Sequence, residues 1–235
     1  NWENITPSEK IMPEWIQINS IEPDPFNPGG LYVAATMYKG DDFQPYLYKT
    51  TNYGKSWKKI VNGIDNDHFT RVIRSDLHKQ GILYAGTEHG MYISFDDGQN
   101  WKSFQLNLPI TPITDLTIKN TDLIVATQGR SFWVLDDLTP LYQLNQKVSE
   151  SNFYLFAPRP TYRFRGGRSE NTFTAGENPP PGVMIHYYFK NKPDSDAVCL
   201  KILEEDGTLI QKFSPVSSEK GILLPVEKNM NRFVW

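Results

Sequence analysis

The sequence has a single cysteine, Cys199, in 235 residues, no Cys/His cluster with zinc-site spacing and no apolar run of membrane-spanning length. One cysteine excludes an internal disulfide framework, and its alternating, strand-like surroundings predict a small buried side chain. The net charge of −3 provides no basic stripe for general nucleic-acid binding. The sequence therefore predicts no metal, no cofactor, no nucleic-acid partner and no membrane span.

Aromatic residues, in contrast, make up 13% of the sequence, and a tryptophan closes its most distinctive segment. Residues 94–101, Ser-Phe-Asp-Asp-Gly-Gln-Asn-Trp, have the spacing S-x-D-x-G-x-x-W, and a weaker copy lies 44 residues earlier, at 50–57. This spacing is typical of a tight turn, because the carboxylate can accept backbone N–H bonds, the glycine can take a positive φ and the tryptophan can fold back over the hairpin. The residues expected to build the two turns are Thr50, Asn52, Gly54, Trp57, Ser94, Asp96, Gly98 and Trp101.

The repeat extends beyond these turns. An apolar strand that ends in a small residue and threonine recurs at residues 31–36, 83–87 and 123–127, and its threonines are 51 and 40 residues apart, which fits four-stranded propeller blades. The third copy keeps an acidic pair but lacks the glycine and tryptophan of the turn. Residues 2–5, Trp-Glu-Asn-Ile, align with the residues that follow each turn tryptophan. We therefore expect the chain to begin inside the outer strand of a blade and to be a fragment of a larger protein.

The pattern changes near residue 150. Residues 146–152 are polar and predict a linker after a first domain of residues 1–145. Residues 153–235 contain short strands separated by turns, which favours a truncated β-sandwich of immunoglobulin or fibronectin type. The predicted fold class is all-β, with a partial β-propeller of about three blades followed by this sandwich.

Residues 1 to about 145 resemble the end of the last propeller in bacterial BNR-repeat proteins related to sortilin, which are often labelled glycosyl hydrolases. The matching segments are residues 83–88, 94–101 and 127–137, and the second of these resembles the Asp-box of such propellers. Residues 177–182 and 231–235 resemble the β-sandwich that follows them. The resemblance implies a secreted, periplasmic or cell-surface protein, and it specifies architecture better than activity.

In a blade of this kind, the Asp-box lies opposite the loops that bind ligands, so its residues are interpreted as structural. The ligand rim should carry the loops between second and third strands and those that enter each blade. The candidate ligand-binding residues in these loops are Asp42, His68, Arg71, Glu88, His89 and Arg130. The alternative interpretation is that they are solvated loop charges. Arg71 and Arg74 are expected to point to opposite faces of their strand.

The leading hypothesis is an interaction module that binds a carbohydrate or a polypeptide and is completed by missing N-terminal propeller blades. The first alternative is part of a glycoside hydrolase, sialidase-like or glucan-active, whose catalytic residues lie partly or wholly in the missing blades. Its two carboxyl groups would have to face each other across one cleft, and such a cleft would need residues of those blades. The second alternative is a structural segment with no ligand. No catalytic residue is assigned, and we expect the fragment alone to be inactive. A further candidate strip for an acidic ligand, or else an interdomain strand, is the basic run Arg159, Arg163, Arg165 and Arg168.

Overall fold

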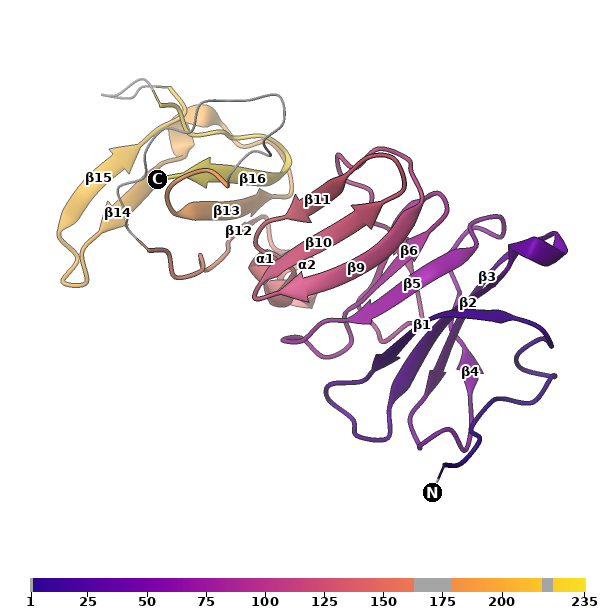
Figure 1. Cartoon of the computed structure of the whole chain (residues 1–235). Coiled ribbons are helices and arrows are strands. Elements are labelled where there is room, and N and C mark those ends of the chain that lie inside the picture. Colours follow the sequence, from indigo (N-terminus) through magenta and orange to yellow (C-terminus); the bar gives the residue numbers. More distant parts are fainter. Residues whose placement is uncertain (1, 163–178, 217–221) are drawn as a thin grey trace. The chain divides into compact units, whose positions relative to one another are not determined.

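The computed structural model describes residues 2–162, 179–216 and 222–235 (Figure 1). The chain divides into two compact units, Asn1–Asp136 and Asp137–Trp235, both built mainly of antiparallel strands. No helix in the described ranges is long and apolar enough to cross a membrane. The domain boundaries expected from the sequence, 1–145 and 153–235 with a linker at 146–152, stay predictions. The segment expected as a linker contains the short helix α2 (Gln146–Glu150).

The first unit contains three antiparallel sheets in which strands that are consecutive in sequence lie side by side (Figure 1). The first sheet has the order β1-β2-β3-β4, the second β5-β6-β7-β8 and the third β11-β10-β9. The strands are β1 (Gln17–Pro23), β2 (Leu31–Met37), β3 (Asp42–Thr50), β4 (Lys58–Lys59), β5 (Thr70–Ser75), β6 (Leu83–Thr87), β7 (Gly90–Ser94), β8 (Lys102–Ser103), β9 (Ile113–Lys119), β10 (Asp122–Thr127) and β11 (Phe132–Leu135), with the 3-10 helix η1 (Tyr38–Gly40) between β2 and β3. The sheet that lacks a fourth strand in the described chain is the one whose sequence lacks the glycine and tryptophan of the turn.

The second sheet packs between the other two. Every residue of β6 and β7 is buried, because β9 of the third sheet contacts β5 and β6 on one side and the first sheet covers the other. Burial on both faces explains why these strands read as nearly continuous apolar runs. The core shared by the first and second sheets consists of Tyr32, Ala34, Leu47, Ile60, Ile64, Ile73, Leu83, Ala85, Tyr92 and Trp101.

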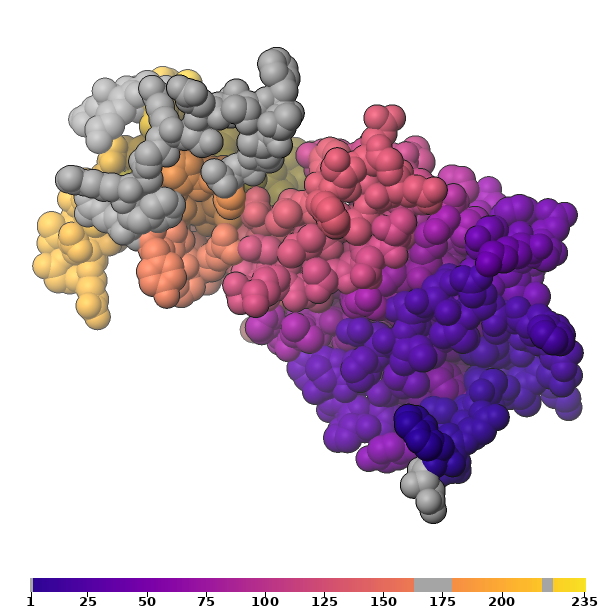
Figure 2. Space-filling model, in the orientation of Figure 1, coloured from indigo at the N-terminus to yellow at the C-terminus, as the bar shows by residue number. Residues whose placement is uncertain are grey.

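The N-terminal segment covers part of the other face of the first sheet. Met12 packs there against Val33, Ala35, Tyr46 and Tyr48, and the N-terminal part of the chain is indigo in Figure 2. The first sheet therefore has apolar contacts on both faces, as the second sheet does.

The second unit contains a three-stranded sheet, β12-β13-β16, and a two-stranded sheet, β14-β15. Its elements are α1 (Thr139–Gln143), α2, β12 (Phe153–Leu155), β13 (Met184–Phe189), the 3-10 helix η2 (Ser195–Ala197), β14 (Leu200–Leu203), β15 (Leu209–Phe213) and β16 (Asn229–Val234). The two sheets share a core in which the rings of Phe213 and Phe233 lie 4.6 Å apart. An immunoglobulin-like sandwich stays a prediction.

Cys199 is exposed, so the expectation of a buried cysteine is wrong. It lies between η2 and β14, one residue before the strand begins. The alternation that suggested a strand starts at Leu200 instead.

Candidate ligand-binding rim

The turn at residues 94–101 is closed by side-chain hydrogen bonds. The Ser94 hydroxyl accepts a bond from the Gly98 N–H at 2.9 Å and donates to Asp96 Oδ1 at 2.9 Å. Asp96 Oδ1 also accepts from the Asn100 N–H at 2.8 Å. Burial tends to raise the pKa of Asp96, but the hydrogen bonds from Asn100 and Ser94 hold it below its usual value. These residues form a turn, as expected from the sequence.

The turn at residues 50–57 repeats this pattern with a neutral acceptor. Thr50 Oγ1 accepts from the Gly54 N–H at 3.0 Å and donates to Asn52 Oδ1 at 3.1 Å, and Asn52 Oδ1 accepts from the Ser56 N–H at 2.9 Å. The φ angles of Gly54 and Gly98 are 78° and 81°. The replacement of aspartate by asparagine therefore leaves the turn geometry intact.

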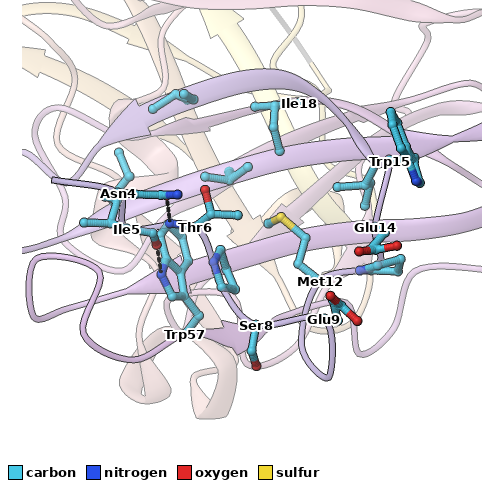
Figure 3. A pocket seen from close by; sticks show the side chains of 16 residues that line it. Asn4, Ile5, Thr6, Ser8, Glu9, Met12, Glu14, Trp15, Ile18 and Trp57 are labelled. Carbon is cyan, nitrogen blue, oxygen red and sulfur yellow. Dashed lines mark hydrogen bonds between the residues drawn. The ribbon is translucent and has the colours of Figure 1, made fainter. Parts of the chain in front are cut away.

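Each turn tryptophan also bonds the sheet or segment that precedes it. Trp101 Nε1 donates to the Ile60 carbonyl at 2.8 Å, and Trp57 Nε1 donates to the Ile5 carbonyl at 2.9 Å (Figure 3). Ile5 and Ile60 occupy the same position of the repeat, three residues after Trp2 and Trp57. The two contacts are thus equivalent by sequence and by geometry.

The two turns follow the ends of β3 and β7. The beginnings of these strands lie at the other edge of the sheets, the candidate ligand-binding rim, and four of the candidate residues contact one another there. Arg71 Nε and Nη2 lie 2.6 and 2.5 Å from Glu88 Oε2, and the Arg71 guanidinium lies 5.3 Å from the centre of the Phe69 ring. His89, the residue after Glu88, stacks on His68 with ring centroids 4.5 Å apart. The structure therefore brings together His68, Arg71, Glu88 and His89.

His68 connects this group to polar residues of the same rim. Its Nδ1 lies 2.8 Å from the Tyr92 hydroxyl, and carboxylate oxygens of Asp65 and Asp67 lie 3.9 Å from its two ring nitrogens. Burial raises the pKa of Tyr92, so its hydroxyl remains protonated. The rim combines hydrogen-bond donors and acceptors with aromatic surface.

Asp42 belongs to a different group of contacts. Its carboxylate accepts a hydrogen bond from the Tyr46 hydroxyl at 2.6 Å, and burial together with this bond raises the pKa of Tyr46 to about 12. Tyr46 is part of the core under the N-terminal segment. The Asp42 carboxylate thus has a partner within its own strand, and its ligand-binding role stays a prediction.

Arg130 lies in the turn between β10 and β11, which is equivalent to the turn that carries Glu88 and His89. Its backbone N–H donates to Thr127 Oγ1 at 3.1 Å, as the His89 N–H donates to Thr87 Oγ1 at 3.1 Å. The Arg130 side chain is exposed.

Arg71 and Arg74 have separate partners. Arg74 donates to Asp115 at 2.6 Å and to the Leu116 carbonyl at 2.8 Å.

Of the basic run, Arg159 is half-buried in the second unit, and Arg163, Arg165 and Arg168 lie outside the described residues.

The rim also contains a hollow of about 270 Å³ that the sequence did not indicate. It is lined by Gln17, Ile18, Asn19, Thr36, Tyr38, Phe69, Arg71 and Thr114, so it spans the beginnings of β1, β5 and β9 and the end of β2. The rings of Tyr38 and Phe69 stack at 5.1 Å. The sequence feature that could have indicated this hollow is an aromatic residue, Tyr38, in a polar hairpin loop.

In the parts of the chain that the structure describes, no group of three or more His, Cys, Asp and Glu side chains is placed to hold a metal ion.

Comparisons with known proteins give no family assignment. No family model matches the chain, and no curated protein matches it. Solved structures that match include YCF48 bound to D1 peptide, at 15% identity and a TM-score of 0.35, with 86% of this chain and 55% of that chain covered.

Two further matches are GH74 enzymes. The enzyme from Niastella koreensis matches at 12% identity and a TM-score of 0.41, with 88% of this chain and 31% of that chain covered. An ancestral GH74 enzyme matches at 16% identity and a TM-score of 0.40, with 83% and 27% covered. The chain thus spans 55%, 31% and 27% of the three structures, and similarities this distant assign neither fold nor activity to it.

Proposed function

We propose that the chain is part of a BNR-repeat β-propeller, followed by an immunoglobulin-like sandwich, and that it binds a glycan or a polypeptide. The support for the propeller is the repetition itself: two four-stranded sheets of identical order, two equivalent turns and two equivalent tryptophan–carbonyl bonds. The Ile5 contact further supports a preceding blade in the parent protein. A secreted, periplasmic or cell-surface location follows from the sequence resemblance and belongs to the same proposal.

The observation that carries the binding function is the linked group on the rim. Arg71 lies in β5, His68 in the loop before it, and Glu88 and His89 in the β6–β7 turn, yet they contact one another through an ion pair and a ring stack. Loop charges that are merely solvated do not need such partners. Binding residues are commonly placed on loops that a rigid scaffold holds in position.

The test is binding of the whole chain to a glycan array and a peptide array. We expect a ligand from one of these classes to lose binding when Arg71→Ala and Glu88→Ala are combined, because the double change removes the pair without leaving an unpaired charge. The matched control combines Lys192→Ala and Glu227→Ala, which removes an ion pair of 2.9 Å in the second unit. No ligand from either class, or equal binding by wild type and the rim variant, contradicts the proposal.

Hydrolysis has less support from the contacts of the carboxylates. Glu88 is paired with Arg71 and Asp42 with Tyr46, whereas glycosidic cleavage requires two carboxyl groups that flank the scissile bond. We expect no turnover of sialosides, β-glucan or xyloglucan oligosaccharides by this chain. Hydrolysis that disappears in Glu88→Gln would instead favour the glycoside hydrolase.

A further inference from the structure

The hollow on the rim arises where the first sheet departs from the repeat. In the second and third sheets, the threonine that ends the inner hairpin strand donates across the turn, Thr87 to the Gly90 carbonyl at 3.0 Å and Thr127 to the Ser131 carbonyl at 2.7 Å. The equivalent Thr36 hydroxyl is buried and has no hydrogen-bond partner among the described residues. Here η1 lengthens the β2–β3 hairpin, and the strand register shifts between Ala35 and Met37.

The same longer hairpin supplies an aromatic surface. Tyr38, the first residue of η1, stacks on Phe69 and keeps 37% of its surface exposed, while Phe43 lies 6.1 Å from Phe69 and is 45% exposed. An exposed aromatic face next to polar groups suits a ligand that has both apolar C–H faces and hydroxyl groups. At about 270 Å³, the hollow is slightly smaller than the usual range of about 300–1,000 Å³ for ligand pockets, so it suits one unit of a longer chain.

Among the described residues that line the hollow, Arg71 is the one that is charged, and its charge is balanced by Glu88 beside it. Arg71 contacts Glu88 through Nε and Nη2, so the two N–H groups of Nη1 lie outside the pair and can donate to a ligand. The Gln17 amide, which donates to Asn19 Oδ1 at 2.9 Å, adds an acceptor oxygen. An acidic ligand would require a free cation here. Lys39 is the nearest candidate in the loop, with Nζ 5.9 Å from the Tyr38 ring centre, and Asp41 and Asp42 follow it.

We propose that this hollow binds an uncharged pyranose unit of an oligosaccharide, stacked against Tyr38 and hydrogen-bonded by Gln17 and Arg71. This inference rests on the binding function proposed above and narrows its ligand to neutral sugars. The buried Thr36 hydroxyl, left unpaired by the lengthened hairpin, is the second feature that distinguishes this hollow from the ordinary turns of the repeat.

The experiment is calorimetric titration of the chain with neutral tetrasaccharides of glucose, mannose and galactose, and with tetragalacturonic acid as the acidic comparison. We expect a neutral tetrasaccharide to bind and the acid to bind more weakly. Tyr38→Ala should weaken binding roughly tenfold, Gln17→Ala should weaken it less, and Tyr38→Phe should retain it. Tyr162→Ala is the control, because this tyrosine of the second unit is 91% exposed.

Three results would overturn the inference while the binding function stands: preference for the acid that is lost in Lys39→Ala, binding of peptides but of no saccharide, or neutral-sugar binding that neither Tyr38→Ala nor Gln17→Ala changes. Absence of any glycan or peptide ligand would overturn both proposals. Gln17 is exposed, so its variant tests the site even where Tyr38→Ala disturbs folding.

Discussion

The turn at residues 50–57 and the turn at residues 94–101 are closed by equivalent hydrogen bonds but have different surroundings. Trp101 is 3% exposed and belongs to the core between two sheets. Trp57 is half-buried and lines an apolar hollow of about 560 Å³ together with Met12 and Ile18 (Figure 3). The shape of the turn is therefore fixed locally, whereas the contribution of the tryptophan to stability depends on what packs against it.

The largest expected difference between the turns concerns the tryptophans. Trp101→Ala should lower the free energy of unfolding by about 3–5 kcal/mol, because it leaves a cavity in a filled core. Trp57→Ala should lower it by less than half as much, since Trp57 is already partly in water. Urea denaturation of both variants measures the difference, and equal losses would show that the two tryptophans are equally important.

The glycines should show a smaller difference. Gly98 has a positive φ, and a Cβ there would lie 2.6 Å from Ile60 Cδ1, so Gly98→Ala should cost about 2–4 kcal/mol from strain and overpacking combined. At Gly54, the Cβ would meet Ile5 in the N-terminal segment, which has fewer contacts to hold it, so we expect a smaller loss. Gly129→Ala is the control, because it has a φ of 85° and open space around it. If Gly129→Ala lowers the free energy of unfolding as much as Gly98→Ala does, backbone strain alone explains the loss and the contact with Ile60 contributes nothing.

The turn acceptors come next. Asp96→Ala should lower the free energy of unfolding by about 1–3 kcal/mol, and Asn52→Ala by less, because hydrogen bonds to a charged acceptor are stronger. Thermal denaturation measures both. Binding of any rim ligand by the folded Asp96→Ala protein should be unchanged, and unchanged stability with abolished binding would move the site to this turn.

The smallest expected effect is a pH dependence that separates the two turns. The pKa of Asp96 is lower in the folded chain than its unfolded value, so its stabilisation is complete above about pH 4 and is lost as the pH falls through the folded pKa. Asp96→Asn should therefore reduce stability at pH 6 and have progressively less effect toward pH 2.5. Urea midpoints across this range provide the measurement, and parallel curves for wild type and variant would contradict it.

The features that the sequence predicted are those encoded within a few residues. The spacing from Ser94 to Trp101 contains every group needed for the turn, and residues 2–5, which align with residues 57–60, include the Ile5 carbonyl that Trp57 bonds. The rim was predicted in part, because loops at the same end of consecutive hairpins must lie near one another. This reasoning grouped Glu88 and His89 with Arg71 and His68.

The features that the sequence did not predict depend on contacts between distant residues. Tyr38 and Phe69 are 31 positions apart, and their stacking follows from a 3-10 turn that no residue pattern marked. Asp42 was grouped with the ligand residues because it is an acid in a loop, and the sequence did not indicate that its carboxylate bonds a tyrosine four positions later. Which of several polar loop side chains is already bonded can be read only from three-dimensional packing.

The bond from Trp101 to the Ile60 carbonyl has a consequence for how such a chain can lengthen. The two turns are 44 residues apart. One repeat contains both Trp57, which donates to a carbonyl of the preceding segment, and the Ile60 carbonyl, which accepts from the tryptophan of the next turn. Duplication of that repeat supplies each new sheet with both the donor and the acceptor of the bond between neighbouring sheets. Other repeat arrays are similar, because each unit contacts only its neighbours. Growth by tandem copying therefore needs no newly evolved interface.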